Sequence, residues 1–123
     1  MTGDLANFRP QDILTVYGER PRCFLSGVWQ FCDGHHILGR GYDHGARKTS
    51  GDRQLFSSIF NFAPLNRDIH QGPQRDATEM RWLLLRLARR NVLESIRRGA
   101  YEITELDDRF LAFAERWRQD NPA

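Results

Sequence analysis

Two helical patterns of apolar residues follow one another in the C-terminal third of the chain, and they constrain the fold more than any other feature. The first starts where Asp76 and Glu79 have the spacing of a capping box, which satisfies the free backbone amides of a helix start. It ends at Gly99, a residue that readily adopts the conformation found just after a helix. Its apolar residues recur every three or four positions, at Leu84, Leu85, Ala88, Val92 and Ile96. The sequence thus predicts a long amphipathic helix here.

The second pattern begins at Thr104 and Asp107, which again have capping-box spacing. Its apolar stripe consists of Leu106, Phe110, Phe113, Ala114 and Trp117. A helix with one apolar face is stable only when that face is buried. We therefore expect the two helices to pack as a hairpin.

Two upstream stretches are rich in β-branched and aromatic residues and predict short strands. The first covers residues 23–37 and contains turn signals at residues 26–27 and 33–34. The second covers residues 55–65 and is expected to end at Pro64, because proline cannot donate a hydrogen bond to a sheet.

The remaining segments are predicted as loops and short helices. Residues 39–54 are rich in Gly and Arg with hardly any apolar residue, which predicts a mobile loop. Residues 66–72 fit a short helix that Gly72 and Pro73 stop. The first twenty residues form either an arm or a short helix.

The length of 123 residues, with 40% of them apolar, is enough for one modest core, so we expect a single domain over residues 1–123. It divides into an N-terminal arm (1–22), a strand-containing core (23–73) and a helical extension (74–123). No apolar run approaches the roughly 20 residues of a membrane span, and the N-terminus lacks the apolar region of a signal peptide. We expect a cytoplasmic protein that does not bind membranes, with Cys23 and Cys32 reduced.

The basic residues hint at a phosphate-containing partner. Of the 18 Lys and Arg residues, all but Lys48 are Arg, whose planar guanidinium suits bidentate contact with phosphate. The formal net charge of +2 excludes little by itself, because many proteins without a nucleic-acid partner have a similar charge.

Two short segments hold the residues best suited to catalysis. Residues 33–37 read DGHHI, and residues 61–70 read NFAPLNRDIH. Together they resemble the motif of the HNH endonuclease family (ββα-metal or His-Me finger nucleases), in particular its small phage-type proteins. The resemblance covers about residues 23–72. It implies an α+β fold in which a β-hairpin packs on a helix around one divalent metal, the ββα-metal (HNH) motif, here with a two-helix C-terminal extension.

The resemblance also implies roles for individual residues. His35 and His70 match the metal-ligand positions, and His36 matches the general base. Asn61 matches the central Asn, which in such proteins pins the loop between the strands and helps to hold the base. Asp33 is an alternative ligand to His35, because residues two apart on a strand share a face.

Hydrolysis of a phosphodiester explains why these residue types are needed. A neutral imidazole can take the proton of the attacking water, which contributes about 10²–10⁴-fold to the rate. A metal with only two protein ligands keeps positions open for water and phosphate oxygens. Because neighbouring residues on a strand point to opposite sides, His35 can face the metal while His36 faces the water, if the strand bends there.

The sequence departs from the family pattern in two ways. Many relatives carry two Cys-x-x-Cys pairs that bind a structural zinc. Here Ser26 stands three positions after Cys23, where the first pair would have its second Cys, and Asn66 and Ile69 stand where the second pair would be. No structural zinc is therefore expected. His35 also replaces the commoner Asp, which makes the site softer. We expect one divalent ion, Mg²⁺ or Mn²⁺ for turnover, with Zn²⁺ or Ni²⁺ as tightly binding alternatives.

Two groups of basic residues have different expected roles. Candidates for contact with the DNA backbone are Arg40, Arg47, Lys48, Arg53 and Arg67. Those expected only to keep the long helix solvated are Arg81, Arg86, Arg89, Arg90, Arg97 and Arg98.

The sequence therefore predicts a metal-dependent endonuclease that hydrolyses DNA phosphodiester bonds, by nicking or cutting, in a bacterial or phage-infected cell. The alternative is a catalytically silent HNH-fold protein that binds DNA or serves as an accessory in a phage or repair complex. A helix-turn-helix regulator built from residues 76–118 is weaker, because Arg is not concentrated on one helix face. RNA or branched substrates stay open, and a homodimer is one way for a one-site enzyme to cut both strands.

Overall fold

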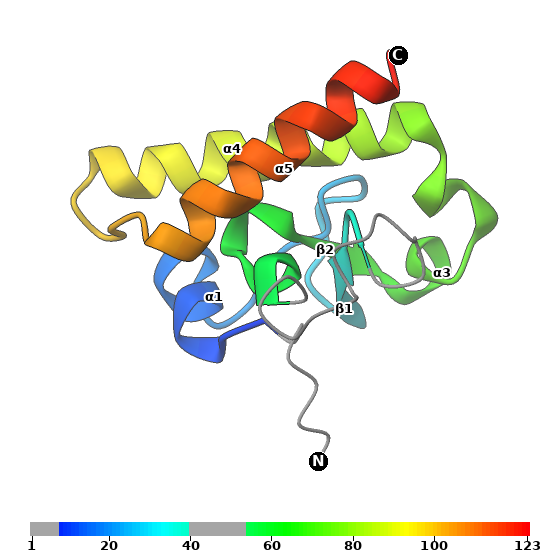
Figure 1. Cartoon of the computed structure of the whole chain (residues 1–123). Coiled ribbons are helices and arrows are strands. Elements are labelled where there is room, and N and C mark those ends of the chain that lie inside the picture. The colour runs from blue at the N-terminus through cyan, green and yellow to red at the C-terminus, as the bar shows by residue number, and fades with distance from the viewer. Residues whose placement is uncertain (1–7, 40–53) are drawn as a thin grey trace.

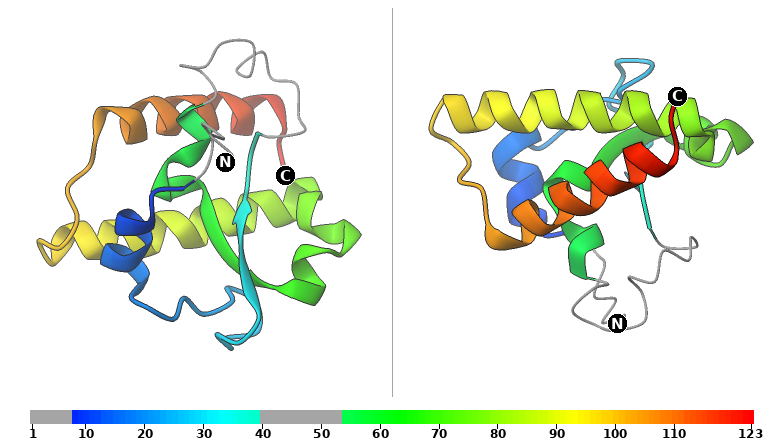
Figure 2. Two further views of the ribbon diagram at one scale, coloured as in Figure 1. Left: turned by 90° about the horizontal axis from the view of Figure 1, so that it is seen from below. Right: turned by 45° about the horizontal axis from the view of Figure 1, so that its top comes forward.

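The computed structural model describes residues 8–39 and 54–123, and it has a mixed α+β architecture (Figure 1). In chain order the elements are α1 (Pro10–Tyr17), β1 (Cys32–His36), the 3-10 helices η2 (Gln54–Ser57) and η3 (Ile59–Asn61), β2 (Phe62–Asn66), α3 (Arg67–His70), the 3-10 helix η4 (Pro73–Asp76), α4 (Thr78–Arg97) and α5 (Glu105–Asp120). The helices α4 and α5 lie over one side of the small sheet, and α1 and α3 flank it at opposite ends (Figures 1 and 2).

The sheet consists of β1 and β2, paired antiparallel with His35 opposite Ala63 and Gly34 opposite Pro64. The predicted second strand was wrong in its bounds: its first half forms η2 and η3, and β2 continues past Pro64 to Asn66. Pro64 fits within β2 because its carbonyl points away from β1 and accepts a hydrogen bond from the Phe24 amide at 3.0 Å. The proline nitrogen faces the same outer edge, so no bond of the ladder is lost.

The first predicted strand is also shorter than the sequence indicated. Residues near Cys23 form a turn, in which the Cys23 sulfur accepts the amides of Leu25 and Ser26, each at 3.4 Å. The second turn signal lies inside β1 instead. Gly34 is required there by packing, because a Cβ atom at this position would approach the Phe62 ring to 2.8 Å.

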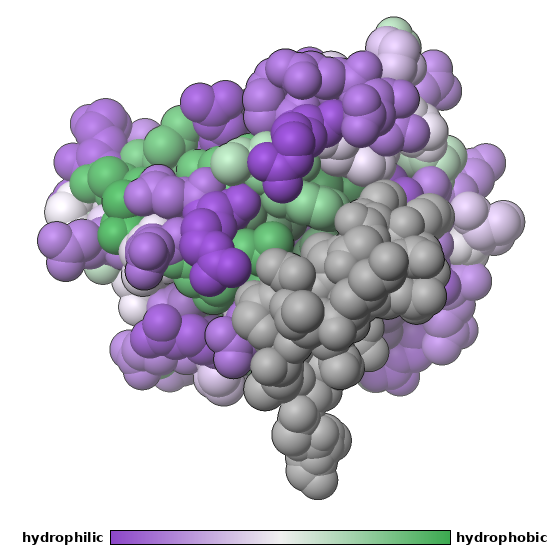
Figure 3. Space-filling view, viewed as in Figure 1, coloured by the Kyte–Doolittle hydropathy of each residue, from purple (hydrophilic) through white to green (hydrophobic). Residues whose placement is uncertain are grey.

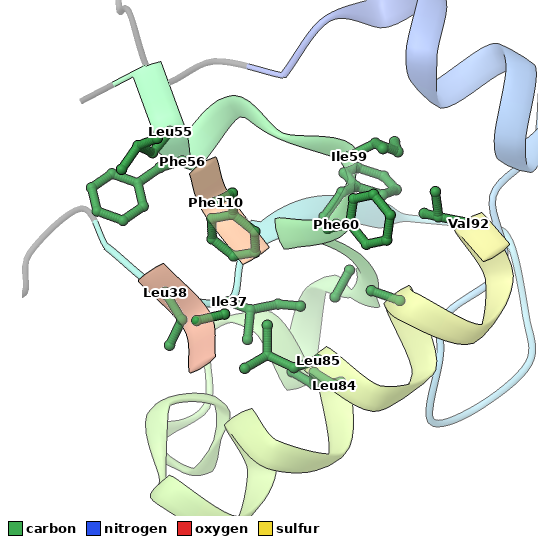
Figure 4. Close-up of a cluster of buried hydrophobic side chains, with 14 of the residues drawn as sticks. Ile37, Leu38, Leu55, Phe56, Ile59, Phe60, Leu84, Leu85, Val92 and Phe110 are labelled. Atoms are coloured by element: carbon green, nitrogen blue, oxygen red, sulfur yellow. The ribbon is translucent and has the colours of Figure 1, made fainter. Parts of the chain in front are cut away.

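A single cluster of buried side chains joins the sheet region to both long helices (Figure 4). The predicted stripes on α4 and α5 supply one layer of the cluster, with Leu84, Leu85, Ala88, Val92, Phe110, Phe113, Ala114 and Trp117 buried. The segments that follow β1 and precede β2 in the chain supply the rest, including Ile37, Leu38, Leu55, Phe56, Ile59 and Phe60. The helical extension therefore forms one side of the core, and the sheet region packs against it.

The start of α5 is confirmed as a capping box, and it carries a buried polar network. Thr104 accepts the Asp107 amide, and the Asp107 carboxylate accepts the Thr104 amide, each at 3.1 Å. The same carboxylate accepts the hydroxyls of Ser58 at 2.7 Å and Tyr101 at 2.5 Å. Burial, followed by this neighbouring carboxylate, raises the pKa of Tyr101. Asp107 thus fixes α5 to η3.

The start of α4 differs from the prediction. Its N-cap is Ala77, which has no capping side chain, and Asp76 ends η4 instead of forming a capping box with Glu79. The Asp76 carboxylate pairs with Arg81 at 3.1 Å. Arg81 is only 4% exposed, so its assignment to the solvated face was wrong, whereas the other five Arg residues predicted there are exposed.

On the face shown in Figure 3, hydrophilic residues dominate along α5, and apolar residues show beside it, between the two long helices. Within residues 8–39 and 54–123, no helix combines the length and the apolar character needed to cross a lipid bilayer.

Candidate metal centre

One face of β1 meets α3 and η4, and this junction brings together two of the predicted histidines. Asn66 ends β2 and also caps α3, where its side chain accepts the Asp68 amide at 3.0 Å. The chain therefore turns directly from strand to helix and carries His70 back beside β1. The rings of His35 and His70 lie 5.1 Å apart, centroid to centroid, with an interplanar angle of 65°.

His35 is buried and electrically neutral at neutral pH. Its residue is 5% exposed, and burial, reinforced by the nearby His70, lowers the pKa of His35 to about 4. Among the described residues the Nε2 atom has no hydrogen-bond partner, and Oδ1 of Asp76 is 3.9 Å away, beyond hydrogen-bond range. A neutral imidazole with an unused nitrogen is the form that binds a metal ion.

His70 is oriented by Asp33. The Nδ1 atom of His70 lies 3.2 Å from Oδ2 of Asp33, and a guanidinium nitrogen of Arg67 lies 3.6 Å from the other carboxylate oxygen. A carboxylate on one ring nitrogen fixes the tautomer and leaves the other nitrogen for a metal. Asp33 was the predicted alternative ligand to His35. In the structure its carboxylate contacts the ring of His70, which is typical of a residue that orients a metal ligand.

Asn61 joins the backbone after β1 to the backbone before β2. It is fully buried, and its Oδ1 accepts the Leu38 amide at 2.8 Å. Its Nδ2 donates to the carbonyls of Leu38 and Phe56, each at 3.1 Å. Asn61 therefore holds the segment after β1 against the segment before β2.

The structure does not bring the ring of His36 to His35 and His70. Its ring stacks on Phe8, with centroids 4.1 Å apart and an interplanar angle of 19°. It lines a surface hollow of about 780 Å³ together with Phe8, Trp29 and Phe62. The bend that would let His36 face the metal-bound water is missing, because β1 stays paired with β2 through His36 and Phe62. Strict alternation along a regular strand therefore places His35 and His36 on opposite faces.

The predicted DNA contacts are only partly within the described residues. Arg67 is exposed at the start of α3, 3.6 Å from Asp33. Outside the described residues lie Arg40, Arg47, Lys48 and Arg53.

Sequence reasoning missed three residues beside His35 and His70. Asp76 faces His35, Arg81 pairs with Asp76, and Arg75 donates a guanidinium hydrogen to the His70 carbonyl. Because its spacing to Glu79 fits a capping box, Asp76 was predicted at the start of the long helix and was not considered as a site residue. The useful signal was the Gly72-Pro73 break, because a carboxylate just beyond it can fold back toward the helix that ends at His70.

The chemistry of these donors fits a divalent metal ion. His35 offers a buried nitrogen without a partner, His70 offers the nitrogen opposite its Asp33 contact, and Asp76 is an ionised carboxylate. Among the residues that the structure describes, no set of three or more His, Cys, Asp or Glu side chains already converges on one point. Small side-chain adjustments would thus accompany binding of an ion.

Comparisons of the chain with family models, with curated proteins and with solved structures found no match.

Proposed function

We propose that this protein is a metal-dependent endonuclease that hydrolyses DNA phosphodiester bonds, with β1, β2 and α3 acting as a ββα-metal unit of the HNH kind. The observation that carries the proposal is the buried, neutral His35 beside a His70 that Asp33 orients. An unpartnered buried imidazole destabilises a fold, so it is typical of a site that a ligand completes. The histidines also occupy the positions that the sequence resemblance assigns to metal ligands.

His35 and His70 would hold the ion, and Asp33 would keep the ring of His70 in the correct orientation. When bound, a divalent ion polarises a phosphate oxygen and stabilises the charge that develops during hydrolysis. Arg67 and Arg75 supply positive charge next to the histidines, where a DNA phosphate would lie.

The residue that takes the proton of the attacking water is a separate part of the proposal. In hydrolysis, water attacks phosphorus, the bond to the leaving oxygen breaks, and the water's proton passes to a base. For His36 to be that base, its ring must leave Phe8 and reach the His35 side of β1. This movement of the His36 ring belongs to the proposal, and the Phe8→Ala variant tests it.

A second candidate function is a catalytically silent HNH-fold protein that binds DNA or serves a larger phage or repair complex. The observation in its favour is the stacking of His36 on Phe8, away from the two metal-binding candidates. Such a protein would bind DNA without cutting it, whether or not metal is present.

Cleavage of supercoiled plasmid distinguishes the two functions. The parent protein is incubated with Mg²⁺, Mn²⁺, Ni²⁺, Zn²⁺ or EDTA, beside His35→Ala, His70→Ala and His36→Ala. Gln74→Ala is the control, since Gln74 is exposed close to the site. Nicking that requires metal, both ligand histidines and His36 supports the nuclease. DNA binding without nicking in any metal, by protein shown to be folded by circular dichroism, supports the silent protein instead.

A further inference from the structure

We infer that Asp76 is a third protein ligand of the same ion, so that the site consists of His35, His70 and Asp76. The inference rests on the metal site of the proposed function, but it adds a residue that lies outside the segment resembling HNH proteins. It changes the expected site from two imidazoles to two imidazoles and a carboxylate.

The distance between His35 and Asp76 carries the inference. Their facing atoms, Nε2 and Oδ1, are 3.9 Å apart. That separation is too long for a hydrogen bond. It is shorter than two metal–ligand bonds of about 2.1 Å placed end to end, so one ion can contact both atoms.

The burial of His35 provides an independent second observation. The residue is 95% buried, since 5% of its surface is exposed, and no residue that the structure describes forms a hydrogen bond with Nε2. A purely structural pair would close to hydrogen-bond distance and satisfy that nitrogen. The gap instead leaves the unpartnered Nε2 facing a carboxylate oxygen across a space the size of an ion.

Asp76 is fixed by groups that do not belong to the histidine pair. Oδ1 lies 3.1 Å from a guanidinium nitrogen of Arg81, and Oδ2 lies 3.4 Å from Nε of Arg75. Arg81 comes from the buried side of α4 and is itself 4% exposed. Partial burial acts to raise the pKa of Asp76, but the hydrogen bond and charge of Arg81 outweigh it and lower the pKa. The carboxylate therefore stays ionised and oriented, as a ligand must be.

This donor set favours borderline cations. Two imidazole nitrogens and one carboxylate oxygen suit Mn²⁺, Ni²⁺ and Zn²⁺, whereas Mg²⁺ prefers oxygen ligands and retained waters. A third ligand still leaves coordination positions for water and a phosphate oxygen.

The test is the affinity for Mn²⁺ alone, measured by calorimetry without DNA for the parent chain, Asp76→Asn and Asp68→Asn. Asp68 is the matched control, because it is an exposed aspartate on α3. We expect Asp76→Asn to weaken Mn²⁺ binding about 10-fold or more and Asp68→Asn to change it less than about twofold. Mn²⁺ affinity in Asp76→Asn equal to that of the parent would overturn the inference.

Two further measurements cover the case in which Asp76→Asn does not fold. Asp76→His removes the charge but restores a donor atom, so it should bind Zn²⁺ more tightly than Asp76→Asn. In the parent chain, addition of Zn²⁺ should shift the ¹³C resonance of the Asp76 carboxyl group, and no shift there at saturation would contradict a ligand role.

The binding and cleavage experiments separate the two claims. Mn²⁺ binding that requires His35 and His70 but not Asp76 overturns this inference and leaves the nuclease proposal intact. Mn²⁺ binding that requires Asp76, in a protein that cuts no plasmid, overturns the nuclease and leaves the three-ligand site. Absence of Mn²⁺ and Zn²⁺ binding by the folded parent overturns the metal site as a whole.

Discussion

The imidazole of His36 stacks on the phenyl ring of Phe8, with 4.1 Å between centroids, on the face of β1 opposite His35. An aromatic contact of this kind contributes about 0.5–1.5 kcal/mol. If His36 is the base, this contact stabilises the arrangement in which it cannot act.

Phe8→Ala should therefore raise the rate of metal-dependent nicking about 2- to 10-fold, as expected when that contact is lost. The measurement is the initial rate of plasmid nicking at saturating Mn²⁺. Leu14→Ala is the control, because Leu14 on α1 is 47% exposed. An unchanged or slower rate in folded Phe8→Ala would show that the stack does not restrain the base.

Acid should destabilise the metal-free protein through His35. Its pKa is about 4 in the folded chain and 6.5 as the ordinary value, so between these values the unfolded chain binds more protons. The free energy of unfolding therefore falls as the pH decreases through this window, by about 2 kcal/mol from about pH 7 to about pH 4.5. Urea unfolding in EDTA should show a smaller loss for His35→Gln, which cannot take up that proton. Equal losses for parent and variant would contradict the buried neutral state of His35.

Asn61→Ala should be strongly destabilising. The change removes three buried hydrogen bonds and leaves the Leu38 amide and two carbonyls without their partner. We expect a loss of about 3 kcal/mol in the free energy of unfolding, measured by urea denaturation. Asn66→Ala is the matched comparison, since it loses one helix cap and should cost about 1 kcal/mol. If the two variants lost equal stability, the hydrogen bonds of Asn61 would not have the strength that their geometry implies.

Asp107→Asn should also lower stability, although it preserves shape. The carboxylate accepts hydrogen bonds from the hydroxyls of Ser58 and Tyr101 and from the Thr104 backbone amide. An Asn side chain has one oxygen and one NH₂ group, so its NH₂ group would face at least one of these hydrogen-bond donors. The expected loss is about 2–4 kcal/mol. Asp108→Asn, at the exposed neighbouring position, should change the urea midpoint little. A midpoint for Asp107→Asn close to that of Asp108→Asn would rule out a stabilising role for the network.

The sequence predicted the long helices well because their signals are local. The apolar stripe of α4 and the capping box at Thr104 depend on residues three or four positions apart, and the structure has both. The short helix was predicted over residues 66–72 from its Gly72-Pro73 stop, and the structure has it at Arg67–His70 with Asn66 as its cap.

The parts that sequence reasoning missed depend on contacts between distant residues. Pro64 is tolerated within β2 because its outer edge faces Phe24, which no local pattern reveals. Asp76 was assigned to a helix cap because its spacing to Glu79 fits one, yet a buried Arg81 binds it instead. The placement of His36 depends on Phe8, a residue 28 positions away by its number in the chain. Local propensity could not have predicted any of these contacts.

One buried side chain, that of Asn61, links the backbone next to β1 to the backbone that leads into β2. Because Leu38, just after β1, and Phe56, before β2, both bond to this one side chain, contacts among the described residues help to fix the register of the strands. The position of His35 on β1, and with it the spacing of His35 from His70, therefore depends on a residue outside the proposed ligand set.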